Sequence, residues 1–339
     1  MTGNAHTTDV IIIGAGPVGL FAAFQCGMVR LSTHVVDVLE DIGGQCAALY
    51  PEKPIYDIPG FSSVTGAELI SRLETQAETF KPTYHLNQRV EKLTREADGR
   101  WTVETSLNTR ITAPAIIIAA GAGAFGPNRP PLDGLEGYEG RSVFYMVRKR
   151  DDFKGKRVVI AGGGDSAVDW AISLSEVARS VAVVHRRDKF RCAPSSSDLL
   201  HKLANSGRIE LVTPYQLHGL EGDGRALSGV AVATLDGQIR TLPADALLPF
   251  FGLATDLGPI AHFGLNMDAH HIVVEPTTCQ TSAPGVFAIG DVAHYPHKLK
   301  LILTGFAEAA QAAHAAFAVV HPDESLHFEH STSMSLPGK

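Results

Sequence analysis

Residues 9–19 read DVIIIGAGPVG, and this stretch decides the fold. Its first five residues form a continuous, mostly apolar and β-branched run, which is typical of a strand buried inside a sheet. A glycine-rich turn follows at residues 14–19, and the stretch LFAAFQCGMV after it has the composition of a helix. The run HVVDV comes next and indicates a second strand, so the segment predicts a β–α–β unit with a parallel sheet.

The three glycines of this turn suit a bound dinucleotide. In such turns the first glycine, here Gly14, makes the tight bend, and the second, Gly16, lets a pyrophosphate approach the backbone. The third, Gly19, lets the helix pack close to the strand, and the helix N-terminus then favours the anion. Asp37 follows Gly14 by 23 residues, where a carboxylate can accept hydrogen bonds from a ribose. A glycine cluster of some other α/β protein is the alternative.

A second copy of the pattern occupies residues 157–187, RVVIAGGGDSAVDWAISLSEVARSVAVVHRR. Its turn begins at Gly162, has Gly164 at the second position and Ala167 at the third, which the pattern permits. The position 23 residues after Gly162 is His185, where the first copy has Asp37. The two copies therefore differ in charge at the position that faces the ribose.

The second copy replaces the acid by the basic run His185-Arg186-Arg187, with Arg191 four residues on. Arginines offer paired donors to a 2′-phosphate, which a carboxylate would repel. Hydrogen bonds to charged groups contribute roughly 1.5–3 kcal/mol each, and about 1.4 kcal/mol is tenfold in affinity. The run thus predicts at least a tenfold preference for NADPH over NADH; a solvated basic turn is the alternative. The candidates for this site are Gly162, Gly164, Asp165, Ser166, Ala167, His185, Arg186, Arg187 and Arg191.

A third signal is GVFAIGDV at residues 285–292, a strand that places Asp291 at its end. This carboxylate would face whatever the first sheet binds, although an aspartate before a helix can also be an ordinary N-cap. The earlier stretch AIIIAAGAGAF ends near Phe125 and is interpreted as the crossover out of the first domain.

Composition excludes several function classes. A chain of 339 residues suits two domains, and a net charge of −7 argues against a nucleic-acid binder. Apolar stretches reach only about ten residues, too short to span a bilayer, and the N-terminus lacks the pattern of a secretory signal. The four cysteines are widely spaced, without a disulfide or metal-ligand pattern. We expect a soluble, cytoplasmic enzyme without a metal.

Two fingerprints, the HRR turn and the IGD strand, in this order, resemble the thioredoxin-reductase-like flavoproteins over nearly the whole chain. The resemblance implies an α/β fold of two Rossmann-like, doubly wound, three-layer domains. It places FAD on residues 1–122 and 257–339, with an NADPH domain of residues 123–256 inserted between them. It also implies that Asp291 bonds the ribityl chain of the flavin.

The chain lacks the redox-active cysteine pair that is typical of that family. Thioredoxin reductases carry C-x-x-C just after the tyrosine that matches Tyr145, but those positions are Met146 and Lys149 here. The glutathione-reductase-like branch carries its dithiol after GG-x-C, and Cys46 in GGQC has no second cysteine within the next eleven residues. Cys46 is interpreted as a small buried hydrophobe. Without an internal dithiol, electrons must leave directly from the flavin.

Three segments resemble the thioredoxin-reductase-like ferredoxin–NADP⁺ reductases in particular: GGQCAALYPEKPIYDIPGF, KLKLILTGFAEAAQAA and the tail HSTS. By that likeness Gln45 and Tyr50 touch the flavin, Tyr50 stacks on one ring face, and Val90 contacts the adenine side. The tail, from His330 to Thr332, would cover the other face in the partner of a homodimer. Tyr50 could instead be an ordinary loop aromatic, and a polar tail is often disordered. The FAD candidates are Gly14, Gly16, Pro17, Val18, Gly19, Asp37, Gln45, Tyr50, Val90, Phe125, Asp291, His330 and Thr332.

The resemblance implies hydride exchange between NADPH and the flavin, and single-electron exchange with ferredoxin or flavodoxin. The cofactor would supply the chemistry, so no acid–base residue is required. An acidic carrier needs a basic patch, and the cations between Arg148 and Arg157 are the candidate, with a solvated interdomain linker as the alternative. A low-molecular-weight disulfide reductase and a non-catalytic flavin-bound redox sensor are the competing functions.

Overall fold

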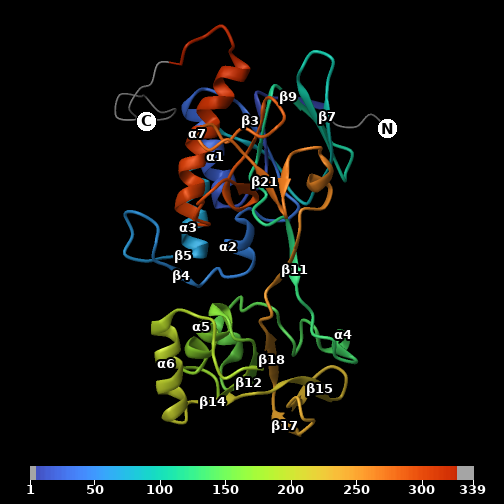
Figure 1. Cartoon of the computed structure of the whole chain (residues 1–339), viewed down its shortest axis with the longest axis vertical. Helices are drawn as coiled ribbons and strands as arrows, with labels where there is room; N and C mark the ends of the chain where they lie inside the picture. The colour runs from blue at the N-terminus through green and yellow to red at the C-terminus, as the bar shows by residue number, and fades with distance from the viewer. Residues whose placement is uncertain (1–4, 327–339) are drawn as a thin grey trace. The chain divides into compact units, whose positions relative to one another are not determined.

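The computed structural model describes residues 5–326, without the side chains of residues 124–127 and 253–255 (Figure 1). Its contacts divide the chain into two compact units. Unit 1 comprises residues 1–125 and 255–339, and unit 2 comprises residues 126–254. The chain passes from one unit to the other through β11 (Ala124–Pro127) and returns through β19 (Leu253–Asp256).

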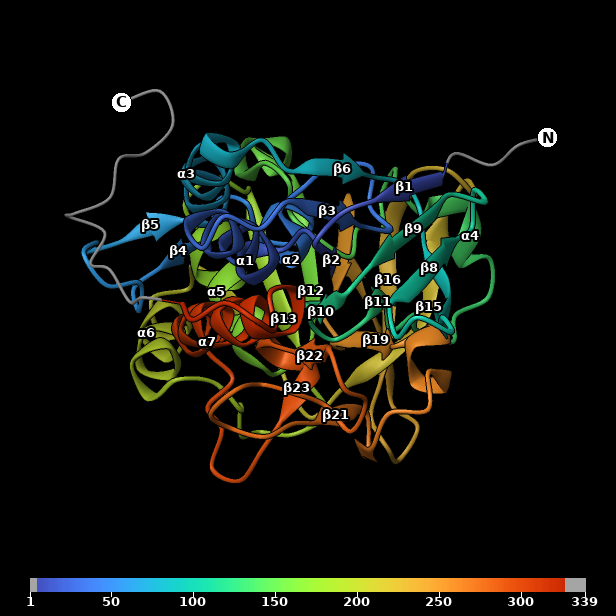
Figure 2. The ribbon, with the colours of Figure 1, turned by 90° about the horizontal axis from the view of Figure 1, so that it is seen from above.

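Unit 1 is built on a five-stranded parallel sheet, in the order β22–β10–β2–β3–β6. Its strands are β2 (Val10–Ile13), β3 (Thr33–Val36), β6 (Thr83–His85), β10 (Ala115–Ile118) and β22 (Val286–Ala288). Three helices pack together beside it, α1 (Pro17–Met28), α3 (Gly66–Ala77) and α7 (Ile302–Val320). They form one group in the upper part of Figure 1, and Figure 2 shows the same three helices from above.

Alternation along β2 shows why this sheet has two covered faces. Val10 and Ile12 pack into a core with residues of α1 and α7. Ile11 and Ile13 point the other way and pack against a second sheet of order β1–β9–β8–β7. Successive side chains of a strand face opposite sides, so a continuous apolar run fills both cores. The second sheet comprises β1 (Ala5–Thr7), β7 (Val90–Arg95), β8 (Trp101–Thr105) and β9 (Arg110–Ala113).

Unit 2 repeats this plan on a smaller scale. Its parallel sheet has the order β14–β13–β12–β18, with α5 (Asp165–Leu174) and α6 (Pro194–Asn205) on one face. The opposite face packs on the antiparallel sheet β15–β16–β17. The strands are β12 (Arg157–Ala161), β13 (Ser180–Val184), β14 (Ile209–Val212), β15 (Gln216–Gly222), β16 (Leu227–Ala233), β17 (Ile239–Pro243) and β18 (Ala246–Pro249).

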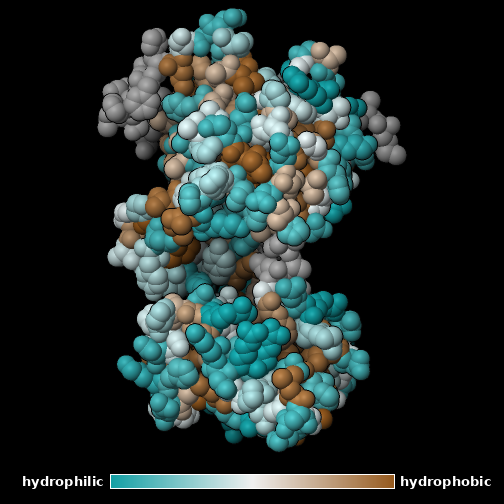
Figure 3. Space-filling view, in the orientation of Figure 1, coloured by the Kyte–Doolittle hydropathy of each residue, from teal (hydrophilic) through white to brown (hydrophobic). Residues whose placement is uncertain are grey.

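The α/β class with two dinucleotide-binding-type domains is confirmed. The structure adds that the long helices of each unit pack on one face of its parallel sheet, while a second sheet, mixed in unit 1 and antiparallel in unit 2, covers the other. Strands such as β9, in which Ile111 and Ala113 are buried and Arg110 and Thr112 are more exposed, form that cover because one face packs on the core and one meets water. Within residues 5–326, no helix is long and apolar enough to cross a membrane. Hydrophilic residues dominate the visible surface of both units (Figure 3).

Candidate dinucleotide sites

The first glycine turn joins β2 to α1, and its three glycines have three different surroundings. Gly14 has a left-handed backbone (φ 112°), and a Cβ there would collide with the carbonyl oxygen of Ala119. A Cβ on Gly19 would collide with the carbonyl oxygen of Gly14. Gly16 is open, since the nearest atom to its ideal Cβ is the Cα of Gly44, 3.9 Å away. Gly14 and Gly19 therefore allow the turn to close, and Gly16 leaves room above the backbone.

Asp37 follows β3 and lies beside this turn. Its Oδ2 accepts the backbone N–H of Ala15 at 2.5 Å, and its Oδ1 accepts that of Leu39 at 2.8 Å. Burial raises the pKa of Asp37, while these backbone hydrogen bonds act to lower it. Each carboxylate oxygen can accept more than one hydrogen bond. The side chain is thus held in one orientation and can still accept from a ligand.

A cavity in unit 1 brings most of the predicted FAD residues together. It is lined by Gly14, Gly16, Pro17, Val18, Asp37, Gln45, Tyr50, Val90 and Asp291, among others. Gly19 is buried instead within α1, on the side that packs against the turn. The side chain of Phe125 and the tail residues His330 and Thr332 lie outside the described residues.

The same cavity contains residues that were not among the FAD candidates. Gln88 and Arg89 line it directly before Val90, and Lys300 to Ile302, which belong to the segment KLKLILTGFAEAAQAA, line it where α7 begins. The segment from Asp256 to Ile260 contributes after the chain returns from unit 2. Adjacency to Val90 was the available signal for the first pair, whereas the 256–260 segment carries no motif that sequence reasoning could use.

The thiols of the chain are not arranged for a dithiol relay. All four cysteines are free. Burial raises the pKa of Cys26 and of Cys279 to about 12, and it also raises the pKa of Cys46 and Cys192. Cys46 lines the unit 1 cavity from α2 (Gly44–Ala48), and its Sγ donates to the Tyr50 hydroxyl at 3.5 Å. Protonated thiols are poor nucleophiles, which disfavours the disulfide-reductase alternative.

The second glycine turn joins β12 to α5 and repeats the geometry of the first. Gly162 has φ 152°, and a Cβ there would collide with the carbonyl oxygen of Phe250. Gly164 is open, with the carbonyl oxygen of Arg191 as its nearest neighbour at 3.9 Å. Ala167 is fully buried and lies 3.0 Å from the ideal Cβ of Gly162, so an alanine fits the third position.

The basic run divides into residues with different surroundings. His185, Arg186 and Arg191 line a cavity together with Gly162, Gly163 and Gly164. Arg191 is attached to the turn, because its backbone N–H donates to the Gly163 carbonyl at 2.6 Å. Arg187 is exposed and is not among the described residues that line this cavity. Asp165 and Ser166 begin α5 outside the lining, and the Asp165 carboxylate accepts the Ala193 N–H at 2.9 Å.

His185 packs rather than carrying charge. Its ring lies so close over Gly163 that a Cβ there would collide with it, and it contacts the Phe190 ring at a centroid distance of 5.2 Å. Burial lowers the pKa of His185, with the neighbouring arginines as smaller contributors. At neutral pH the imidazole is therefore uncharged, and the cations that face the cavity are Arg186 and Arg191.

Half of the cations proposed for the carrier patch are used inside unit 2. Arg150 pairs with Glu176 at 2.9 Å, and Arg157 pairs with Asp245 through two side-chain hydrogen bonds. The Lys156 ammonium lies 5.7 Å from the Phe153 ring centroid. The other three, Arg148, Lys149 and Lys154, are exposed.

Comparison with known proteins places these observations in a family. The model of the pyridine nucleotide-disulphide oxidoreductases matches residues 8–317. A ferredoxin–NADP reductase of Paramagnetospirillum magneticum is 64% identical over 98% of both chains. One of Granulibacter bethesdensis is 60% identical over 98% of this chain and 95% of its own. Among solved structures, a Lactococcus lactis thioredoxin reductase has a TM-score of 0.78 at 25% identity, covering 93% of this chain and 99% of its own.

Proposed function

The chain belongs to the pyridine nucleotide-disulphide oxidoreductase family, and we propose that it is an FAD-dependent reductase that exchanges electrons between NADPH and ferredoxin. The observation that carries the proposal is the pair of glycine turns with opposite charge beside them. Relatives at 64% and 60% identity, named ferredoxin–NADP reductase, support the choice of partner.

The unit 1 cavity fits FAD by the shape of its backbone. Gly16 and Gly44 are neighbours, and a side chain on Gly16 would extend into the open space that a pyrophosphate needs. The first turn of α1 contains no acidic residue and no side-chain cap, so its amides are available to an anion. We infer that the Asp37 carboxylate accepts hydrogen bonds from the adenosine ribose and that the Asp291 carboxylate accepts them from the ribityl chain. Tyr50, Gln45 and Val90 contact the rings in this arrangement.

The unit 2 cavity fits NADPH by its charge. Arg186 and Arg191 provide guanidinium donors for a 2′-phosphate, and Gly164 leaves the backbone open to a pyrophosphate. The buried Nε2 of His185 has no hydrogen-bond partner among the described residues, so a polar group is available at the wall of this cavity. We infer that Gly162, Gly164, Arg186 and Arg191 bind the cofactor, and that His185 shapes the turn.

The residues of this chain bind and orient, and the redox chemistry belongs to the cofactors. FAD bound in unit 1 would supply hydride exchange with NADPH and single-electron exchange with the carrier, so one NADPH would correspond to two molecules of a one-electron carrier. Asp37 is already fixed by two backbone amides, which spares the site a reorganisation on binding. The four cysteines are free and widely spaced in the sequence, and burial raises the pKa of each thiol, so we assign them no part in the electron path.

We place the carrier site on the exposed cations Arg148, Lys149 and Lys154. An acidic ferredoxin would be steered by them, and rim charges act mainly on association rate and salt dependence. Charge reversal at Arg148 and Lys149 should raise the KM for ferredoxin several-fold and flatten its dependence on salt. Charge reversal at the exposed Lys92 of unit 1 is the control. A salt profile identical to that of the wild type would refute this placement.

We further propose a cytoplasmic homodimer in which His330 and Thr332 cover the flavin of the partner subunit. The family resemblance of the tail supports this arrangement, and four free cysteines suit a reducing compartment. Light scattering after size exclusion should give twice 36.1 kDa. A mass of 36.1 kDa at micromolar concentration would contradict the dimer.

The function is tested by NADPH-driven reduction of cytochrome c with and without ferredoxin. We expect a yellow protein whose rate rises with added ferredoxin and is unaffected by thiol reagents. A rate of cytochrome c reduction that does not change when ferredoxin is added, and that falls on thiol alkylation, would instead favour a disulfide reductase.

A further inference from the structure

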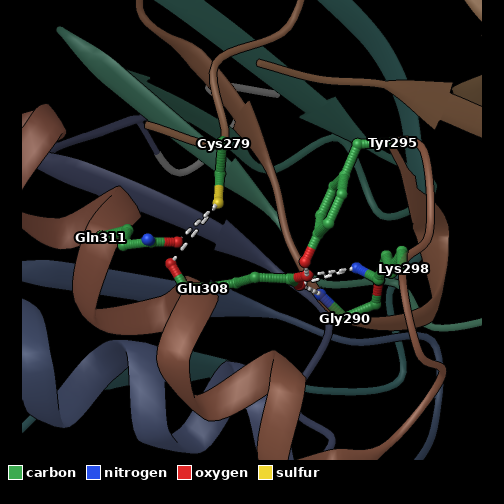
Figure 4. Close-up of polar contacts among 6 residues, drawn as sticks. All are labelled: Cys279, Gly290, Tyr295, Lys298, Glu308 and Gln311. Atoms are coloured by element: carbon green, nitrogen blue, oxygen red, sulfur yellow. Dashed lines mark hydrogen bonds and ion pairs between the residues drawn. The ribbon is translucent and has the colours of Figure 1, made fainter. Parts of the chain in front are cut away.

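An ion pair in unit 1 is buried to an unusual degree for charged side chains. Lys298 and Glu308 are only 4% and 2% exposed, and Lys298 Nζ donates to both carboxylate oxygens of Glu308, at 2.6 and 2.7 Å. The Tyr295 hydroxyl donates to Glu308 Oε1 at 2.8 Å (Figure 4). Glu308 belongs to α7, whereas Lys298 and Tyr295 precede that helix.

Both ions also bind the backbone of one residue of the cavity wall, Gly290. The N–H of Gly290 donates to Glu308 Oε2 at 2.7 Å, and Lys298 Nζ donates to the Gly290 carbonyl at 2.7 Å. Gly290 is the residue before Asp291 and has a left-handed backbone (φ 70°). The negative carboxylate of Glu308 thus accepts from the N–H of Gly290, and the positive ammonium of Lys298 donates to its carbonyl.

The pair further connects two parts of the FAD cavity. Lys298 lies two residues before Lys300, and the segment from Lys300 to Ile302 lines the cavity, as do Gly290 and Asp291. Gly305 of α7 allows this close approach, because a Cβ there would meet Val18 at the first turn of α1 and lie 3.4 Å from the Gly290 Cα.

Stability alone does not account for such a pair. Replacing a buried ion pair by well-packed apolar side chains is often neutral or stabilising, so the pair is weak evidence for a stabilising role. An apolar pair, however, would leave the N–H and C=O of Gly290 without these partners. Buried polar groups need partners, and this requirement fixes the orientation of the two peptide groups on either side of Gly290.

We propose that Glu308 and Lys298 are positioning residues for FAD, which hold Asp291 and the start of α7 in the geometry that the cofactor requires. The inference rests on the proposed FAD site in unit 1. Its own claim is that Glu308 acts through the Gly290–Asp291 turn.

The test is titration of flavin-free protein with FAD, followed by the quenching of flavin fluorescence. In Glu308→Gln the amide NH₂ faces a donor and Lys298 loses its counterion, so we expect the Kd for FAD to rise about tenfold. Asp291→Ala should raise it as well. Since Glu308 acts through Asp291, Glu308→Gln should add less than threefold in the Asp291→Ala background. Two full, multiplicative effects would refute the proposal.

A matched control separates positioning from folding. Asp245 likewise pairs with an arginine and accepts a backbone N–H, that of Arg157, but in unit 2. Asp245→Asn should lower the melting temperature and leave the Kd for FAD unchanged. The charge-swapped double variant Lys298→Glu, Glu308→Lys restores a pair but reverses its polarity toward Gly290. Wild-type FAD affinity in that variant would refute positioning.

If Glu308→Gln fails to fold, Tyr295→Phe serves instead, because it removes a single hydrogen bond from Glu308. We expect a rise of a few-fold in the Kd for FAD, and an unchanged value would count against the proposal. Failure of the wild-type protein to bind FAD would overturn the proposed function itself. Wild-type binding together with an unaltered Glu308→Gln would overturn only the positioning role.

Discussion

The two glycine turns share a backbone and differ in the residue 23 positions after the first glycine. In both turns the first glycine would collide with a carbonyl oxygen from a neighbouring strand end if it carried a Cβ, and the second is open. Beside the first turn is Asp37, which accepts two backbone N–H groups. Beside the second is His185, which packs on Gly163. The dinucleotide device is therefore repeated, and the neighbouring charge distinguishes the cofactors.

The structure also separates the basic residues beside the second turn into charged and neutral ones, which the sequence alone does not do. His185 occupies the position of Asp37, but burial lowers its pKa and leaves it neutral. Arg186 and Arg191 face the cavity, and Arg191 is attached to the turn through the Gly163 carbonyl. We infer that preference for a phosphorylated ribose depends on these two arginines and not on a histidine cation.

The largest expected effect comes from filling each open glycine in turn. In Gly16→Ala the new Cβ meets no protein atom closer than 3.9 Å, so the fold should survive. It would intrude on the pyrophosphate of FAD, and overpacking costs typically 1–3 kcal/mol, so we expect FAD affinity to fall about ten- to a hundredfold. Gly164→Ala should lower NADP⁺ affinity to a similar degree. Calorimetric titration of both ligands into both variants measures this.

The two glycine variants should differ in which ligand they lose. Gly16→Ala should leave NADP⁺ affinity unchanged, and Gly164→Ala should leave FAD affinity unchanged. Loss of both ligands from either variant would mean that the turns are not separate sites. Circular dichroism on each variant shows that the fold is retained.

The next effect is on nucleotide preference. Arg186→Ala and Arg191→Ala should each reduce the ratio of kcat/KM for NADPH to that for NADH by about tenfold, since each removes a hydrogen bond to a charged group. Arg187→Ala is the matched control, because Arg187 is exposed and outside the described cavity lining. If the preference for NADPH is retained in Arg186→Ala and Arg191→Ala but is lost in Arg187→Ala, then Arg187 and not the other two arginines binds the 2′-phosphate.

The smallest effect concerns the strands that lead into the second turn. The Arg157 hydrogen bond lowers the pKa of Asp245 to about 2, from an ordinary 3.8. The folded state thus favours the carboxylate, so this stabilisation is complete above pH 3.8 and is lost as pH falls toward 2. Because the side chain is 37% exposed, we expect less than about 1 kcal/mol.

In practice, Asp245→Asn should lower the melting temperature by roughly 2 °C near pH 7. The gap between variant and wild type should shrink below pH 4 in a calorimetric series. A gap that stays constant down to pH 3 would mean that the ion pair does not stabilise unit 2.

Repeated local patterns were the part of the fold that sequence could predict. A strand, a glycine turn and a helix form from neighbouring residues, so both β–α–β units and both turns are visible in the chain. The sheets that cover the second face were not expected, because pairings such as the parallel pairing of β1 with β9 join distant segments through backbone groups that leave no motif.

The candidate sites divide in the same way. Gly14, Gly16 and Asp37 belong to a spacing rule and line one cavity. Lys298 and Glu308 follow no such rule, and their meeting depends on how the segment before α7 folds back on that helix. Likewise, the sequence shows three consecutive basic residues, whereas only packing separates neutral His185 from Arg186.

Hydrogen–deuterium exchange of the flavin-free protein, with FAD and with NADP⁺ added separately, shows which turn binds which cofactor. FAD should protect the amides of the first turn and the start of α1. NADP⁺ should protect the second turn and the segment from His185 to Arg191. Protection of the same turn by both ligands, or protection of the second turn by FAD alone, would mean that the two turns are not separate sites for the two cofactors.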